Sequence, residues 1–141
     1  MKVTYSQQVR YSDLAQDAQL RTTAIFELLQ EAAIRHASMR GDSPADLRKH
    51  GFAWVLHKLA VQITGSARLG DILDVITWSR GSKGFKAFRD FTVFSQGNEV
   101  ARASSVWAYL DFSSLRIQRI PSELMERYTI EDERSLEMNL E

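Results

Sequence analysis

One long amphipathic helix, followed almost entirely by strand-like segments, is the feature that most restricts how this chain can fold. Residues 22–39 form the helical stretch, and Gly41 is expected to end it. At about 100° per residue, one helical face collects Ile25, Leu28, Leu29, Ala32, His36 and Met39. Such a face must lie against a large apolar surface, and the later strands have to supply it.

Four strand-like runs rich in valine, isoleucine, phenylalanine and tryptophan follow the helix, with glycines between them. They cover residues 52–64, 71–80, 85–95 and 99–112, and Gln96-Gly97-Asn98 predicts a hairpin between the last two. An opening strand is expected from Val3 to Tyr11, and a short helix from Ser43-Pro44 to Lys49. A short strand over 116–120 and a small helix over 122–127 complete the order.

This order predicts one α+β domain in which a curved antiparallel sheet wraps around one long central helix. Residues 1–128 are expected to form that domain, and residues 129–141 a loose acidic tail. Several strands are apolar at both odd and even positions, which indicates that both faces of the sheet are covered. The helix covers one face, and a second subunit could cover the other.

Composition excludes several classes of function. The 141 residues carry 18 basic and 18 acidic side chains, and this balance gives no reason to expect a nucleic-acid partner. The chain has no cysteine, which suits a reducing cytoplasm, and no apolar stretch long enough to span a membrane. His50 and His57 have no carboxylate cluster around them, so we expect no metal site and no cofactor.

The local sequence resembles the acyl-acyl-carrier-protein (acyl-ACP) thioesterases, which have the hot-dog fold. The helix segment 28–33 with His36-Ala37 is similar to their central helix, and Trp54-Val55-Leu56, Gly70-Asp71 and Thr77-Trp78 are similar to the next strands. Residues 88–91, 101–107 and 116–121 resemble the end of the domain. The resemblance covers residues 9–123 and implies a single hot-dog domain like the N-terminal half of the two-domain enzymes, which is the half associated with the acyl-chain pocket.

The same resemblance puts the family's catalytic residues in doubt. In the two-domain enzymes catalysis is attributed to the C-terminal domain, where an Asp-x-Asn-x-His pattern precedes the helix. Here those three positions fall on Ala15, Asp17 and Gln19. The hydroxybenzoyl-CoA thioesterases use an aspartate that would also fall on Ala15.

The loop before the helix is the expected site of the thioester carbonyl, because a helix N-terminus can stabilise developing negative charge. Asp17 is the first candidate for the carboxylate that activates water or attacks directly, and Gln19 could hold the water. Asp13 is a further candidate. All three could instead be ordinary loop or capping residues. Glu31 also competes, although Arg35 at i+4 favours a surface ion pair.

The substrate-binding candidates divide into an acyl slot and a basic cluster. Thr22, Thr23 and Phe26 on the helix, together with His36 and Trp54, are expected to contact the acyl thioester, although a lone histidine on an apolar face is more often a core residue. Arg80, Lys83 and Lys86, with Arg89, could meet the phosphates of coenzyme A or an acidic carrier protein, or could form an ordinary hairpin rim.

The sequence therefore predicts hydrolysis of an acyl-ACP, or with less support an acyl-CoA, by a cytoplasmic homodimer or homotetramer whose sheets join edge to edge. A non-catalytic module that binds an acyl chain or acyl carrier is one alternative. A hot-dog dehydratase acting on hydroxyacyl thioesters is another, in which only His36 could serve as the histidine of the site.

Overall fold

The computed structural model describes residues 1–138 and 140 and confirms the hot-dog arrangement. In chain order the elements are β1 (Val3–Gln8), a 3-10 turn (Tyr11–Asp13), α1 (Thr22–Met39), α2 (Pro44–Lys49), β2 (Phe52–Ile63), β3 (Ile72–Lys83), β4 (Lys86–Ser95), β5 (Asn98–Asp111), β6 (Arg116–Gln118) and α3 (Ser122–Met125).

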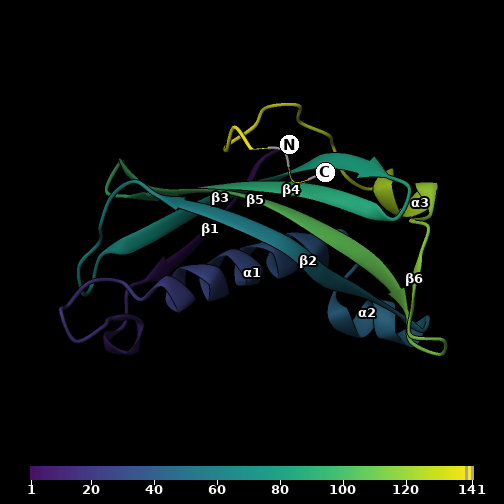
Figure 1. Ribbon diagram of the computed structural model, residues 1–141, viewed down its shortest axis with the longest axis horizontal. Helices are drawn as coiled ribbons and strands as arrows, with labels where there is room; N and C mark the ends of the chain where they lie inside the picture. Colours follow the sequence, from purple (N-terminus) through teal and green to yellow (C-terminus); the bar gives the residue numbers. More distant parts are fainter. Residues whose placement is uncertain (139, 141) are drawn as a thin grey trace.

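The strands form one antiparallel sheet in the order β1-β3-β4-β5-β2, and β6 pairs with β5 near its C-terminal end. The sheet arches over α1, with α2 at one end of the arch and the loop that precedes α1 at the other (Figure 1). The hairpin predicted at Gln96-Gly97 joins β4 to β5, and both residues have positive φ, as such a tight turn requires.

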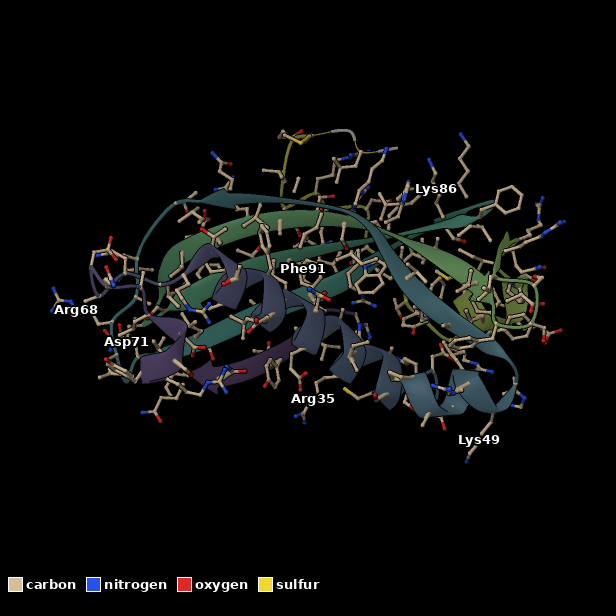
Figure 2. The ribbon with its side chains drawn as sticks, turned by 60° about the horizontal axis from the view of Figure 1, so that its bottom comes forward. Arg35, Lys49, Arg68, Asp71, Lys86 and Phe91 are labelled. Carbon is tan, nitrogen blue, oxygen red and sulfur yellow. The ribbon has the colours of Figure 1, made fainter. Side chains whose placement is uncertain are left out.

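The inner face of the sheet and α1 form the main core. Ile25, Leu28, Leu29, Ala32 and His36 are buried as the helical periodicity predicts. Figure 2 shows Phe91 of β4 between the sheet and α1, while Arg35 points away from the core. The prediction that Met39 belongs to the buried face is wrong. Met39 is the last helical residue and is 62% exposed, and the buried face ends with His36 and Ala37.

The C-terminal segment, residues 129–138, is packed against the protein, although the sequence predicted a loose tail. It runs over the outer face of the sheet, opposite α1 (Figure 1). Ile130 bridges Ser79 of β3, and the indole Nε1–H of Trp78 donates to the carbonyl of Glu133 over 2.8 Å. The segment is acidic but can pack here because its backbone supplies the hydrogen bonds and Leu136 is buried.

An ion pair beneath this segment ties it to the sheet. The carboxylate of Asp90 accepts from Arg80 Nε and from Ser104 Oγ, both over 2.9 Å, and from the backbone N–H of Ser135 over 2.8 Å. All of these groups lie on the outer face. The C-terminal segment therefore covers part of the outer face, which the sequence analysis suggested a second subunit could cover.

Candidate functional site

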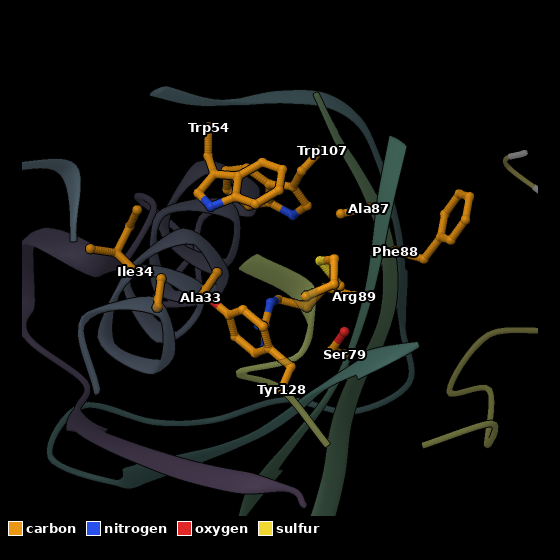
Figure 3. Close-up of a pocket in the computed structure, with 11 residues that line it drawn as sticks. Ala33, Ile34, Trp54, Ser79, Ala87, Phe88, Arg89, Trp107 and Tyr128 are labelled. Carbon is orange, nitrogen blue, oxygen red and sulfur yellow. The ribbon is translucent and has the colours of Figure 1, made fainter. Parts of the chain in front are cut away.

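An apolar slot lies between the C-terminal half of α1 and the inner face of the sheet (Figure 3). Ala33, Ile34 and Ala37 of α1 form one wall, and Trp54 of β2 and Trp107 of β5 form another. The slot is narrow and holds about 450 Å³ of empty space, which includes its opening to solvent. Its lining is mostly apolar, which suits contact with an alkyl chain.

Small helix residues and large sheet residues together create the slot. Ala33 and Ala37 are four positions apart, so both point toward the sheet and leave room there. Trp54 lies opposite Tyr109 in the register, which places it diagonally from Trp107 on the same face. The indole N–H of Trp107 donates to Ser105 Oγ over 2.9 Å, which holds that ring against the sheet.

One end of the slot is polar and buried. Arg89 of β4, only 8% exposed, reaches toward Ala33 and Tyr128 (Figure 3). Its Nη1 group donates to His36 Nδ1 over 2.8 Å and to Thr77 Oγ1 over 3.0 Å. No carboxylate among the described residues lies within ion-pair distance of Arg89. Burial lowers the pKa of Arg89 to about 10, so the group keeps its charge at neutral pH.

His36 accepts the hydrogen bond from Arg89, so its Nδ1 carries no proton. Burial, followed by the positive charges of Arg89 and Arg40, lowers the pKa of His36 to about 4. The imidazole is therefore neutral at physiological pH. The partner of this histidine is a cation and not an acid, which is the reverse of what the dehydratase alternative needs.

Tyr128 closes the polar end and is held by a second buried group. Its hydroxyl donates to Asp42 over 3.0 Å, and its ring meets the His36 ring edge to face at 5.4 Å. Arg127 pairs with the other oxygen of Asp42 at 2.5 Å. Burial raises the pKa of Asp42 and of Tyr128, so the phenol stays protonated. Because Asp42 precedes α2 and Tyr128 follows α3, this network joins both small helices to the slot.

A second hollow lies next to the slot, beside α2. It shares Ile34 and Trp54 with the slot, and Arg48 and Phe112 lie on its far side. The guanidinium of Arg48 lies 5.2 Å from the centre of the Phe112 ring. The shared side chains of Ile34 and Trp54 show that the two spaces are adjacent.

The predicted catalytic loop lies at the opposite end of α1. Asp17 and Gln19 are exposed at its tip, where Asp17 Oδ1 accepts from the backbone N–H of Gln19 over 3.1 Å. Thr22 and Thr23 are exposed at the helix start, and Thr23 Oγ1 accepts from Arg21. Eleven residues of helix, about 16 Å, separate Thr22 from the slot wall at Ala33. Within one subunit the structure does not bring this loop to the slot.

Asp13, the third candidate for the catalytic carboxylate, is held in the loop by Arg10. It is buried and accepts from the backbone and side chain of Arg10, with ion-pair atoms 3.0 Å apart. Burial raises the pKa of Asp13, but the hydrogen bonds and charge of Arg10 outweigh it, so the pKa lies below its usual value. Glu31 forms the predicted surface ion pair with Arg35 at 2.9 Å.

The predicted basic cluster is divided among three places. Arg80 lies on the outer face with Asp90, and Arg89 lies on the inner face in the slot. Lys83 and Lys86 flank the exposed turn between β3 and β4. Strand alternation separates these residues, because neighbouring side chains point to opposite faces. Only Lys83 and Lys86 remain a surface pair that could meet a carrier.

Of the other predicted contacts, the structure places Trp54 in the slot wall and His36 at its polar end, while Phe26 is half-buried nearer the start of α1. Sequence reasoning missed Arg89, Trp107 and Tyr128 as slot residues. The period of two in β4 could have identified Arg89, because it alternates with the buried Phe91 and Val93. Nothing near Tyr128 in the sequence indicated its contact with the slot.

Two features are absent from the described part of the chain. It contains no helix that is long and apolar enough to cross a membrane. Over the same residues no group of three or more histidine, aspartate or glutamate side chains is arranged to hold a metal ion.

Comparison with known proteins agrees with this architecture. The sequence model of the protein family described as the acyl-ACP thioesterase N-terminal domain matches residues 1–128. The palmitoyl-acyl carrier protein thioesterase of Arabidopsis thaliana is 29% identical over 126 residues, which cover 82% of this chain and 30% of that protein. The chain thus spans about a third of the length of this curated relative.

Solved structures show the same fold. An acyl-ACP thioesterase from Bacteroides thetaiotaomicron is 22% identical and superposes with a TM-score of 0.88, covering 99% of this chain and 58% of that one. A 1,4-dihydroxy-2-naphthoyl-CoA thioesterase from Synechocystis is 18% identical and superposes with a TM-score of 0.81. The superposition covers 90% of this chain and 95% of that one.

Proposed function

Because this chain belongs to the acyl-ACP thioesterase N-terminal-domain family, we propose that it hydrolyses a fatty acyl thioester whose alkyl chain lies in the slot. The observation that carries the proposal is the slot itself, an apolar space between α1 and the sheet in the domain that the family model matches. Acyl-ACP is the favoured substrate, and acyl-CoA is the second choice.

The reaction needs a base and a site that stabilises the carbonyl oxygen. Water attacks the thioester carbon while a carboxylate takes a proton from the water. The carbon–sulfur bond then breaks, and the protonated carboxyl group returns this proton to the departing sulfur, which releases a fatty acid and a thiol. Asp17 remains our candidate for the base and Gln19 for the group that orients the water. Lys83 and Lys86 on the exposed turn are candidates for contacts with the phosphate or the acidic carrier.

A second copy of the chain is part of this proposal. Asp17 and the slot lie at opposite ends of α1, so one subunit alone does not combine them. In a two-fold dimer the loop of one copy could lie beside the slot of the other. A homodimer or homotetramer, in a reducing compartment such as the cytoplasm, is the assembly that we propose.

A non-catalytic acyl-binding module is the second candidate. It is favoured by the slot lining, which includes no carboxylate among the described residues. Such a module would hold the acyl chain but leave the thioester intact.

Release of free thiol from decanoyl-ACP and decanoyl-CoA separates the two candidates. Hydrolysis predicts continuous thiol release by the wild type, at least a hundredfold slower release by Asp17→Asn, and an unchanged rate for Asp132→Asn, an exposed aspartate on the C-terminal segment. Binding of decanoyl-ACP without thiol release would support the binding module. Full activity of Asp17→Asn would remove Asp17 as the base and leave hydrolysis standing.

A further inference from the structure

The polar end of the slot has a chemistry that an ordinary alkyl chain does not use. Arg89 is a buried cation, and both of its hydrogen bonds leave from Nη1, to His36 and to Thr77. Its Nε and Nη2 groups make no hydrogen bond to another described residue. Neither is a fully buried atom, because Arg40 Nε is the only fully buried side-chain nitrogen or oxygen without a partner among the described residues. A buried guanidinium without a counter-ion is costly, so the fold maintains here a charge that nothing in the described chain neutralises.

The groups around Arg89 cannot supply the missing negative charge. His36 is neutral and uses its Nδ1 lone pair on Arg89. Tyr128 donates its proton to Asp42, and its ring lies 5.9 Å from the guanidinium carbon. Asp42 is itself paired with Arg127. The neighbours therefore hold the guanidinium in place and leave its remaining N–H groups for a ligand.

The walls of the slot restrict what that ligand can be. Ala33, Ala37, Trp54, Trp107 and Met125 are apolar, so a free inorganic anion would gain nothing from most of the space. A carboxylate at the end of an alkyl chain fits both parts. Its two oxygens match the fork formed by two guanidinium N–H groups, and its methylene groups lie against the alanines and indoles.

We propose that the inner end of the slot is a carboxylate-binding subsite, in which Arg89 pairs with the carboxylate of an alkyl chain. The carboxylate could belong to an acyl thioester that carries a second acid group at its far end, or to a free fatty acid. The first source rests on the proposed hydrolase function, whereas the second requires only the slot.

The test compares ligands of equal length that differ in charge. Decanoate and decanol are titrated into the wild-type protein by calorimetry, and the fluorescence of Trp54 and Trp107 in the slot walls reports binding. We expect decanoate to bind at least tenfold more tightly than decanol. Equal affinity for the two ligands would overturn the subsite, as would a lack of binding by both.

Variants of Arg89 locate the effect. Arg89→Met should weaken decanoate binding at least tenfold and leave decanol binding unchanged, because methionine preserves the apolar contacts and removes the charge. Arg89→Lys keeps the charge but loses the fork of two N–H groups. Its affinity for decanoate should therefore lie between those of the wild type and of Arg89→Met. Arg68→Met removes an exposed arginine of the β2–β3 connection and should change neither affinity (Figure 2). A preference for decanoate that persists in a folded Arg89→Met protein would place the carboxylate elsewhere.

A second comparison identifies the source of the carboxylate and separates this inference from the proposed hydrolysis. Decanoyl-pantetheine is compared with a pantetheine thioester of the same chain that bears a terminal carboxylate. If the wild type releases thiol faster from the second compound, and Arg89→Met loses this preference, the natural substrate is an acyl thioester with a carboxylate at the far end of its chain. Binding of decanoate without that preference indicates a free fatty acid. Absence of thiol release from both thioesters would remove the hydrolase and leave the affinity for decanoate intact.

Discussion

At the scale of single residues, the two ion pairs of Asp90 and Glu31 differ in burial and should differ in energetic importance. The side chains of Asp90 and Arg80 are 0% and 7% exposed, whereas those of Glu31 and Arg35 are 43% and 62% exposed. We expect Asp90→Asn to lower the free energy of unfolding by about 3 kcal/mol, because it breaks a buried pair. Glu31→Gln should change it by at most about 0.5 kcal/mol.

Urea unfolding of both variants measures the difference. The shared chemistry of the two substitutions makes Glu31→Gln the control for loss of one negative charge. Equal destabilisation by the two variants would contradict a structural role for the buried pair.

His36 should make stability depend on pH. Its pKa is lowered from 6.5 to about 4 in the folded protein, so between these values the unfolded chain binds more protons. Stability therefore falls as the pH decreases through this window, by about 2 kcal/mol between pH 7 and pH 5. His36→Gln should reduce this dependence, because glutamine does not titrate.

Urea unfolding at several pH values compares His36→Gln with His50→Gln and His57→Gln, whose imidazoles are exposed. The comparison between variants cancels the carboxyl groups that titrate in the same range. A His36→Gln protein that loses stability as steeply as the wild type would show that another group is responsible.

At the scale of elements, the C-terminal segment should act as part of the fold. It covers Trp78, which is 2% exposed, and donates a backbone N–H to Asp90. Truncation after Tyr128 should shift tryptophan emission to the red and cost about 3 kcal/mol of stability, because Trp78 becomes exposed and Asp90 loses a donor.

Two substitutions at Ser135 refine this test. Ser135→Ala and Ser135→Pro both remove the hydroxyl, but only the proline also removes the N–H that binds Asp90. The proline variant should therefore be the less stable of the two by about 1 kcal/mol or more. An unchanged emission spectrum after truncation would mean that the segment does not shield Trp78.

At the scale of the whole molecule, the proposed reaction depends on two copies sharing a site. We expect Asp17→Asn and Ala33→Trp, which fills the slot, each to be inactive alone. Refolding the two variants together should restore about a quarter of the wild-type thiol-release rate, because half of the dimers are mixed and each contains one complete site.

Ala33→Trp mixed with the double variant Asp17→Asn, Ala33→Trp is the matched control, since no combination of these chains contains an open slot. Sedimentation of the mixture verifies that dimers form. Failure of the first mixture to regain activity, with dimers present, would place base and slot in the same subunit or remove Asp17 from the reaction.

Apart from the 3-10 turn, the sequence alone determined the order of the elements and their bounds to within three residues. Hydrophobic periodicity and the residues that start or end a helix are local signals. They predicted the helix from Thr22 to Met39, which Gly41 follows, and the helix from Pro44 to Lys49. The same holds for the hairpin at Gln96-Gly97, whose turn chemistry lies in two residues.

The tertiary structure alone decided the site. Arg89 and His36 are 53 positions apart, and Tyr128 and Asp42 are 86 apart, so no local pattern predicts their contacts. The tail packs on β3 and β4 for the same reason, through bonds such as that between Ser135 and Asp90. The slot is the space left between Ala33, Ala37, Trp54 and Trp107, and empty space depends on how elements distant in sequence pack together.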